Sequence, residues 1–291
     1  MNTQSLRWIA ALALGFIALP LVAAQKEAGV GKSFKGPVGL QLYSLRGEFT
    51  KNVPETMKKV GGYGFKEVEL AGTYNLTPDK LKQLLADNGL VAVSAHFPYA
   101  RYRDDAAGVA KEAKALGLKY AGVAWIDHKD DFDEAECRAA IEVFNKAGAA
   151  LAKEGIKFFY HCHGYEFTKA GDGTLMDLLM KETDPKLVSF EMDVLWVHFP
   201  GQDPVKWLEK YPKRWELMHL KDLRKGIATG VQTGKGDPNN DVVLGTGQLD
   251  WKAILPAAKK AGVKHYFIED ESADAANQIP QTLSYLEQIK F

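Results

Sequence analysis

Short apolar runs alternate with longer amphipathic stretches along most of this chain. Each apolar run has the length of a buried strand, and the stretches between the runs repeat apolar residues every three or four positions, as amphipathic helices do. The pattern predicts eight strands, at 38–43, 65–70, 91–96, 120–125, 156–159, 187–193, 215–220 and 265–269.

Helix start and stop signals lie between these strands. Thr77 precedes Pro78, as a capping residue precedes the first helical turn, and Asn88 and Gly89 are typical of a helix end. The predicted helices are 54–60, 78–88, 106–116, 133–154, 174–181, a short helix from Pro204, 250–261 and 278–289.

Eight strand-then-helix units predict a (β/α)8 TIM barrel, an α/β fold, because strands joined through helices pair in parallel. A doubly wound open sheet is the competing fold, but it would need a Gly-rich phosphate turn after the first strand, and 42–47 has only one glycine. No linker or composition shift breaks the series, so 37–291 is predicted to be a single domain. The polar, Gly-rich segment 224–247 lacks periodicity and is predicted to be a lid or a flexible tip.

The first residues differ from the rest of the chain. Arg7 precedes an apolar run, 8–22, and small residues follow, as in a signal peptide cleaved after Ala24. The run is short for a membrane span, so we expect 1–24 to be removed and the mature protein to be exported, periplasmic or secreted, without a stable membrane anchor. A polar, flexible leader, 25–36, would follow.

The charge balance limits the partners to expect, and the cysteine content limits the disulfides. Lys and Arg together number 37, as do Asp and Glu, so nothing attracts nucleic acid or an anionic membrane in general. Any acidic partner must therefore be recognised locally. Cys137 and Cys162 are the two cysteines. A bridge between them is conceivable, but a buried apolar role for each fits their surroundings better.

Candidate chemistry is densest in the octet 160–167, which follows the fifth strand. Alternation along a strand points His161 and His163 the same way, and Glu166 follows them in the predicted loop. Two imidazoles and a carboxylate are suitable ligands for a divalent metal. The alternative is two hydrogen-bonded core histidines and a solvated glutamate.

The carboxyl ends of the other strands carry more such side chains, and this is the face where TIM barrels place their sites. Asp193, His219 and Glu269 each have a structural alternative, as a turn cap, a core histidine and a rim charge. Because polar side chains gather at one rim, a metal centre explains them better together than separately. The side chains in question are Glu69, His96, 125–128, His161, His163, Glu166, 191–193, 219–222 and 269–271.

Several of these stretches resemble the sugar phosphate isomerase/epimerase family of xylose isomerase-like TIM barrels. The resemblance covers essentially all of 37–291 and rests on short motifs at the strand ends. They are VGLQLYSLR at 38–46, YHCH at 160–163 with EF at 166–167, MDVLW at 192–196, HLKD at 219–222, GQLDW at 247–251 and FIED at 267–270.

The resemblance implies one divalent cation held by Glu, Asp, His and Glu from strands five to eight. Asp193, His219 and Glu269 match directly. On strand five, many relatives have a glutamate where His161 stands. We assign the ligand to Glu166, as similar sequences with a His-x-His-x-x-Glu pattern suggest, with His161 as the alternative. Mn²⁺ suits this oxygen-rich set best, and Zn²⁺ or Co²⁺ would also fit.

The implied activity is a metal-dependent isomerisation or epimerisation of a non-phosphorylated sugar or keto-sugar through a stabilised enediolate. Glu166 and Glu269 would share proton transfer. His163 would assist as a base and Lys221 as a cation for the developing oxyanion.

Substrate contacts and rival functions complete the prediction. His96, Trp125, Trp196 and His161 are the candidate substrate contacts, although the aromatic residues could equally be core residues. Two alternatives stay open: a 3-keto-glycoside lyase or hydrolase working by β-elimination, and a non-catalytic sugar- or metal-binding protein.

Overall fold

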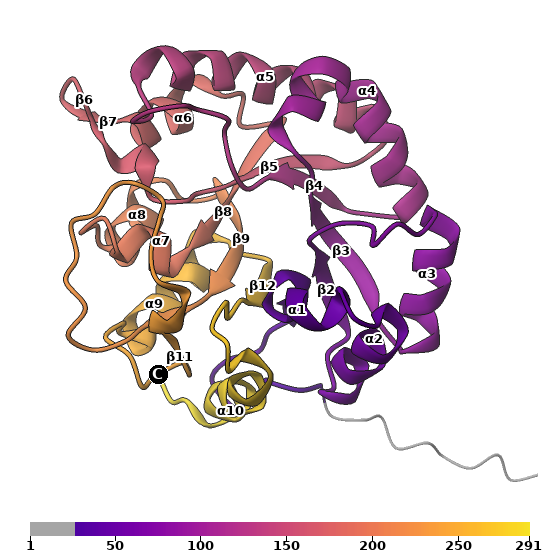
Figure 1. The fold of residues 1–291 in the computed structure, drawn as a ribbon. Coiled ribbons are helices and arrows are strands. Elements are labelled where there is room, and N and C mark those ends of the chain that lie inside the picture. Colours follow the sequence, from indigo (N-terminus) through magenta and orange to yellow (C-terminus); the bar gives the residue numbers. More distant parts are fainter. Residues whose placement is uncertain (1–26) are drawn as a thin grey trace, which may run out of the picture.

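The computed structural model describes residues 27–291, and within them the predicted closed barrel is confirmed (Figure 1). All neighbouring strands pair in parallel, in the order β1-β12-β9-β8-β5-β4-β3-β2. The barrel strands are β1 Val38–Gln41, β2 Glu67–Leu70, β3 Val91–His96, β4 Tyr120–Val123, β5 Lys157–His161, β8 Val188–Asp193, β9 Trp215–Leu220 and β12 His265–Ile268.

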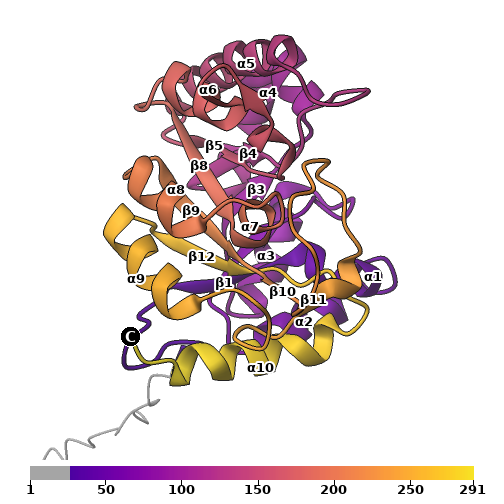
Figure 2. The ribbon, with the colours of Figure 1, turned by 90° about the vertical axis from the view of Figure 1, so that its left-hand side faces the viewer.

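Helices surround the barrel on its outside, as Figures 1 and 2 show from two directions. Each of them follows a barrel strand. They are α2 Val53–Gly62, α3 Pro78–Asp87, α4 Tyr99–Leu116, α5 Glu134–Ala152, α6 Leu175–Glu182, α8 Pro204–Lys210, α9 Trp251–Ala261 and α10 Ala275–Gln288. No helix among the described residues is both long and apolar enough to cross a bilayer.

Local capping chemistry accounts for where these helices begin and end. Thr77 accepts a hydrogen bond from the Lys80 amide at the start of α3, as the sequence predicted, and Asp133 forms a capping box with Glu136 at the start of α5. Gly117 ends α4 in the left-handed conformation, which costs glycine little.

Smaller elements escaped the prediction because they are too short to show a period. They are η1 Leu42–Leu45, α1 Arg46–Phe49, η2 Tyr165–Phe167, the β6–β7 hairpin (Lys169–Ala170 and Gly173–Thr174), α7 Val194–His198, η3 Pro238–Asn240 and the β10–β11 pair (Asp222–Leu223 and Asp241–Val242). The β10–β11 pair closes the base of the long segment 224–247.

The lower half of the barrel interior is packed with apolar side chains. Phe159 and Phe267 are fully buried there, in contact with Val93, Tyr120 and Leu217. Gly39 and Gly122 make room for the two rings: a Cβ on Gly39 would lie 2.8 Å from the Phe267 ring, and one on Gly122 would lie 2.6 Å from the Phe159 ring. This apolar layer separates the polar side chains at the carboxyl end of the barrel from those at the other end, such as Lys157 and Glu216.

Two predictions about the chain outside the barrel have different outcomes. The predicted signal peptide, 1–24, lies outside the described residues, so export stays a prediction. The described part of the predicted flexible leader, 27–36, packs closely instead: Phe34 is buried against Tyr266, and the Gly29 amide donates to Glu287. Its single aromatic side chain gives this segment an apolar anchor. Cys137 and Cys162 are free, buried thiols.

Candidate metal centre

Four side chains meet where β5, β8, β9 and β12 end. His161 and Asp193 are the last residues of β5 and β8, His219 lies near the end of β9, and Glu269 follows β12. These strands are neighbours in the barrel, and Asp193 pairs with His219 in register. One possible ligand atom from each residue lies within 4.8 Å of the others. We call His161, Asp193, His219 and Glu269 the upper cluster.

The geometry of the upper cluster suits a cation. His219 Nδ1 lies 3.2 Å from Glu269 Oε2 and 3.7 Å from Asp193 Oδ2, and His161 Nε2 lies 3.5 Å from the same Asp193 oxygen. Within the described part of the chain, both ring nitrogens of His161 and Asp193 Oδ2 are buried and make no hydrogen bond. Buried polar atoms without partners are costly, and coordination to one metal ion would satisfy Asp193 Oδ2 and one of the two His161 nitrogens.

The charges of the upper cluster favour a cation as well. Burial alone would raise the pKa of the Asp193 carboxyl, but the charge of Lys221 and the contacts with His161 and His219 outweigh burial and hold this pKa well below its usual range. The same balance, led by Lys221 and His219, lowers the pKa of Glu269. Two carboxylates and two imidazoles form a nitrogen and oxygen donor set without thiolate, which fits Mn²⁺, Co²⁺ or Zn²⁺.

The assignment of Glu166 as the strand-five ligand does not agree with the structure, which places His161 in that position. Glu166 is fully buried in η2, where it accepts hydrogen bonds from the Tyr160 hydroxyl and from the amides of His163 (2.9 Å) and Gly164 (2.8 Å). Tyr160 packs against Phe144 of α5, so the Glu166 carboxylate faces the helix layer. The chain turns outward after His161, which removes Glu166 from the barrel mouth.

Glu166→Gln is expected to leave the affinity for Mn²⁺ within about twofold of wild type and to lower the free energy of unfolding by about 1.5–3 kcal/mol. The NH₂ group of glutamine cannot accept the hydrogen bonds that the Glu166 carboxylate accepts from the Tyr160 hydroxyl and the two backbone amides, so at least one backbone amide loses its acceptor. Isothermal titration with Mn²⁺ and urea denaturation measure the two effects. A large loss of Mn²⁺ affinity at unchanged stability would restore Glu166 as a ligand.

A second group of polar side chains meets His219 on the side of its ring opposite to the upper cluster. It consists of Glu69 and His96, at the ends of β2 and β3, together with Gln41 and Glu191, and it reaches His219 from the other side of the ring. His96 Nε2 lies 3.1 Å from Glu191 Oε2 and 3.2 Å from Glu69 Oε1. The sequence analysis included Glu69 and Glu191 among the polar side chains at the rim but gave neither a specific role, and it noted Gln41 only as part of a matching motif. Strand alternation offered a signal for Glu191, which shares a face with Asp193.

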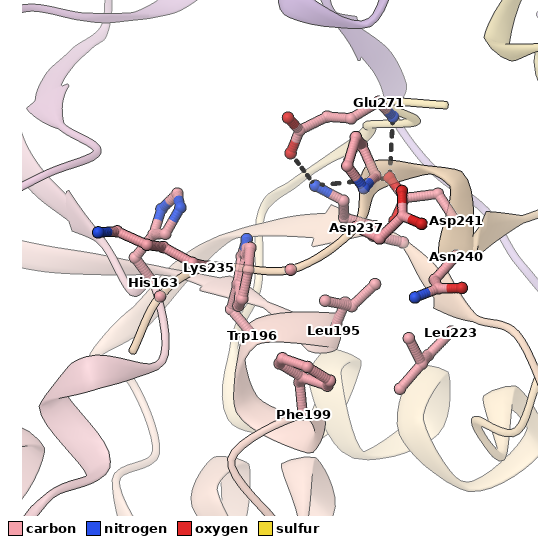
Figure 3. A pocket seen from close by; sticks show the side chains of 14 residues that line it. His163, Leu195, Trp196, Phe199, Leu223, Lys235, Asp237, Asn240, Asp241 and Glu271 are labelled. Carbon is pink, nitrogen blue, oxygen red and sulfur yellow. Dashed lines mark hydrogen bonds and ion pairs between the residues drawn. The ribbon is translucent and has the colours of Figure 1, made fainter. Parts of the chain in front are cut away.

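A cavity of about 220 Å³ opens beside the upper cluster (Figure 3). His163 and Trp196 stack on one side of it, with their ring centroids 4.7 Å apart. Asp241 and Glu271 lie on another side (Figure 3). The fully buried Lys221 contacts Glu271 and lies 3.7 Å from Asp241 Oδ2 and 3.2 Å from Glu269 Oε2. Lys221 therefore links the cavity to the upper cluster.

Burial sets the protonation of two groups around this cavity. Burial, together with the neighbouring His161, lowers the pKa of His163 to about 3, so this imidazole is neutral at physiological pH. Burial raises the pKa of Asp241 to about 7, although Lys221 opposes the shift. The cavity thus offers a carboxyl that titrates near neutrality, which suits proton transfer, whereas His163 is too weak a base at this pKa for the base role predicted from the sequence.

The segment 224–247, predicted to be a lid or a flexible tip, forms one edge of the cavity. Asp222 anchors its C-terminal end by accepting hydrogen bonds from the amides of Gly245 (2.8 Å) and Gly247 (3.2 Å) and from the Trp251 indole (3.0 Å). At the other side of the mouth, the Gly230 amide donates to the Phe199 carbonyl at 2.7 Å. The segment is thus held at several points.

The predicted substrate contacts fall in different places. Trp196 lines the cavity, whereas Trp125 lies behind it, edge-on to His163, and half-exposed. His96 belongs to the second polar group, and His161 belongs to the upper cluster. Of the four residues, Trp196 is therefore the one placed to contact a molecule in this cavity.

Comparison with known proteins identifies a family whose fold agrees with the structure. The family model described as xylose isomerase-like TIM barrel matches residues 57–289. An inosose dehydratase of Geobacillus thermodenitrificans is 33% identical over 159 residues, and the alignment covers 52% of this chain and 52% of that protein. The chain therefore spans about half the length of this curated relative.

Two solved structures extend the comparison to the whole fold. A sugar phosphate isomerase/epimerase from Parabacteroides distasonis is 25% identical with a TM-score of 0.73, and the match covers 92% of this chain and 98% of that one. The IOLI protein with a bound zinc atom superposes with a TM-score of 0.66 at 14% identity, covering 86% of this chain and 95% of that one. At that identity the second likeness concerns the fold alone.

Proposed function

This chain belongs to the xylose isomerase-like TIM barrel family, and we propose that it is a divalent-metal-dependent lyase that removes water from a neutral, polyhydroxylated ketone of the inosose or keto-sugar class. The observation that carries the proposal is the upper cluster, with His161, Asp193, His219 and Glu269 beside a cavity that contains a buried lysine. The inosose dehydratase relatives favour dehydration over the epimerisation that the sequence motifs first suggested.

The residues of the upper cluster would hold the cation, which as a Lewis acid makes a carbon next to a ketone more acidic. Glu269 contacts Lys221, which lines the cavity, and is the candidate base for that carbon's proton. Lys221 lies 3.2 Å from Glu269 Oε2, and its charge stabilises negative charge developing nearby. Elimination then breaks the C–O bond on the adjacent carbon, and an acid protonates the departing hydroxyl to give water and an enone. Asp241 and Glu271 face the cavity and could supply that proton.

Electrostatics favour an uncharged substrate. Three carboxylate side chains face the cavity, against the two cations Lys221 and Lys235. Lys221 is already paired with Glu269 and Glu271 and has no charge free for a phosphate. The stacked rings of His163 and Trp196 offer a flat face suited to the C–H side of a sugar or cyclitol ring. The three carboxylates are Asp237, Asp241 and Glu271.

Epimerisation is the second candidate, because the solved sugar phosphate isomerase/epimerase is similar along nearly its entire length. The two reactions share removal of a proton next to the ketone and differ in the fate of the resulting enediolate. Return of a proton to the opposite face gives an epimer, and loss of a β-substituent gives the lyase product.

The deciding experiment incubates Mn²⁺-loaded protein with an inosose and, separately, with a 3-keto-glucoside in D₂O. We expect water loss from the inosose, detected by mass spectrometry as the enone product. Inverted product without water loss would show an epimerase, and release of the aglycone from the glucoside would show a glycoside lyase. Bound Mn²⁺ without any deuterium exchange would indicate a non-catalytic binder. Each of these three results would overturn the dehydratase proposal.

A further inference from the structure

We propose that Glu69, held in place by Gln41, is a positioning residue that fixes the tautomer and orientation of His219. The inference rests on the proposed function, because it describes how the metal centre presents one of its ligands. Glu69 touches neither the cavity nor the other residues of the upper cluster, so its effect would pass through His219.

The two ring nitrogens of His219 face opposite partners. Nε2 lies 2.7 Å from Glu69 Oε1, whereas Nδ1 faces Glu269 and Asp193 in the upper cluster. Gln41 Nε2 donates to the same Glu69 oxygen at 2.7 Å. The side chains of Gln41, Glu69 and His219 are fully buried, so water does not compete for these contacts. We call Gln41, Glu69 and His219 the histidine relay.

The direction of each hydrogen bond in the relay follows from which of the two groups carries a hydrogen to donate. The Tyr43 amide donates to Gln41 Oε1 at 3.0 Å, which turns the NH₂ group of Gln41 toward Glu69. An ionised carboxylate only accepts, so with Glu69 ionised the 2.7 Å contact favours a hydrogen on Nε2. The contact of Nδ1 with Glu269 Oε2 is longer, at 3.2 Å, and is the one that coordination to a metal would replace. A neutral imidazole with its hydrogen on Nε2 has its lone pair on Nδ1, the nitrogen that faces the upper cluster. Carboxylates commonly orient metal-binding histidines in this way.

The same neighbourhood could instead be a second metal site, since ligand atoms of Glu69, His96, Glu191 and His219 lie within 4.8 Å of one another. Two contacts favour the relay. A second ion would require His219 Nε2 to lose the hydrogen that Glu69 accepts. It would also place a hydrogen on His96 Nδ1, facing the NH₂ group of Gln41 at 3.4 Å. One cation per chain is therefore expected.

Glu69→Gln tests the relay through Mn²⁺ affinity, measured by electron paramagnetic resonance of the free ion. We expect the dissociation constant to rise about 10–100-fold. Glu67→Gln is the matched control: it makes the same change on the same strand and removes a carboxylate–histidine contact of the same length, 2.7 Å to His265, at the other end of the barrel. Equal affinities in wild type and Glu69→Gln would overturn the proposal, as would two Mn²⁺ ions per wild-type chain.

A second measurement needs no variant and guards against misfolding of Glu69→Gln. In the Zn²⁺-loaded wild-type protein, ¹⁵N NMR is expected to show His219 with its hydrogen on Nε2 and the metal on Nδ1. Coordination through Nε2 would overturn the relay while leaving the metal centre intact. A wild-type protein that binds neither Mn²⁺ nor Zn²⁺ would overturn the proposed function itself, and the two failures are thereby distinguished.

Discussion

Asp193→Asn is expected to weaken Mn²⁺ binding by about 100-fold or more and to reduce turnover in parallel. This loss of affinity is larger than that typical of changing a residue that only hydrogen-bonds to a metal ligand. Asp193 has two roles that this substitution separates. Its Oδ1 accepts a hydrogen bond from the Trp196 amide at 3.0 Å and caps α7, a role that asparagine performs equally well. Its Oδ2 faces His161 and His219 and accepts no hydrogen bond, so removing its negative charge weakens the metal centre rather than the helix cap.

Asp203→Asn is the control for this prediction, because Asp203 caps α8 through the amides of Val205 and Lys206, outside the upper cluster. Titration with Mn²⁺ and thermal unfolding of the metal-free proteins should show normal affinity for Asp203→Asn and similar unfolding temperatures for both variants. If Asp193→Asn bound Mn²⁺ as tightly as wild type, Asp193 would be only a helix cap.

Lys221→Met is expected to lower turnover by about 10²–10³-fold, the range found when a group that stabilises developing charge is removed. Lys221 is fully buried, and its amine contacts Glu269 and Glu271 and lies 3.7 Å from Asp241 Oδ2. Without it, these carboxylates repel one another and Glu269 loses the charge that keeps it ionised. Steady-state kinetics on the inosose substrate measure the effect.

The same substitution leaves buried charge uncompensated, which costs about 3–5 kcal/mol of stability, so folding must be measured beside activity. Lys157→Met is the matched control, because Lys157 pairs with Glu216 at 2.5 Å on the opposite side of the apolar layer of the barrel. Lys221→Arg keeps the charge and should recover part of the stability. Full turnover in folded Lys221→Met would assign Lys221 a purely structural role.

The fold was predictable because a (β/α)8 barrel repeats one local pattern. Buried parallel strands appear as continuous apolar runs, and covering helices appear as amphipathic stretches, so each unit can be recognised without knowledge of its neighbours. Helix α4 shows the limit: its first turns begin at Tyr99, before the predicted start at 106, and its backbone leaves the helical conformation at Asp105. A kink hides the period on which the prediction depends.

The candidate-site residues that lie at the ends of strands could be predicted from the sequence. Asp193, His219 and Glu269 terminate strands or follow them directly, and parallel strand ends must meet at one rim. The fifth strand was harder, since a carboxylate is the more usual ligand type there and Glu166 supplied one nearby. Sequence spacing does not show where the chain leaves the barrel wall. Alternation alone placed His161 inward, and the structure agrees with alternation.

The histidine relay could not be predicted from local sequence, because its partners are remote. Glu69 and His219 lie 150 positions apart in the chain, and Gln41 lies 28 positions from Glu69. The sequence alone cannot distinguish a buried glutamate that contacts a metal ligand from a solvated glutamate at a strand end. Closing the barrel brings the three residues together.

The residues of the upper cluster all come from the part of the chain between positions 161 and 269, whereas Gln41 and Glu69 belong to the first two strands of the barrel. A chimaera that joined the later strands of this protein to the early strands of a relative could therefore inherit every ligand and still present His219 through the wrong nitrogen. Exchange of half-barrels between relatives would preserve function only when residues 41 and 69 were inherited together with residue 219.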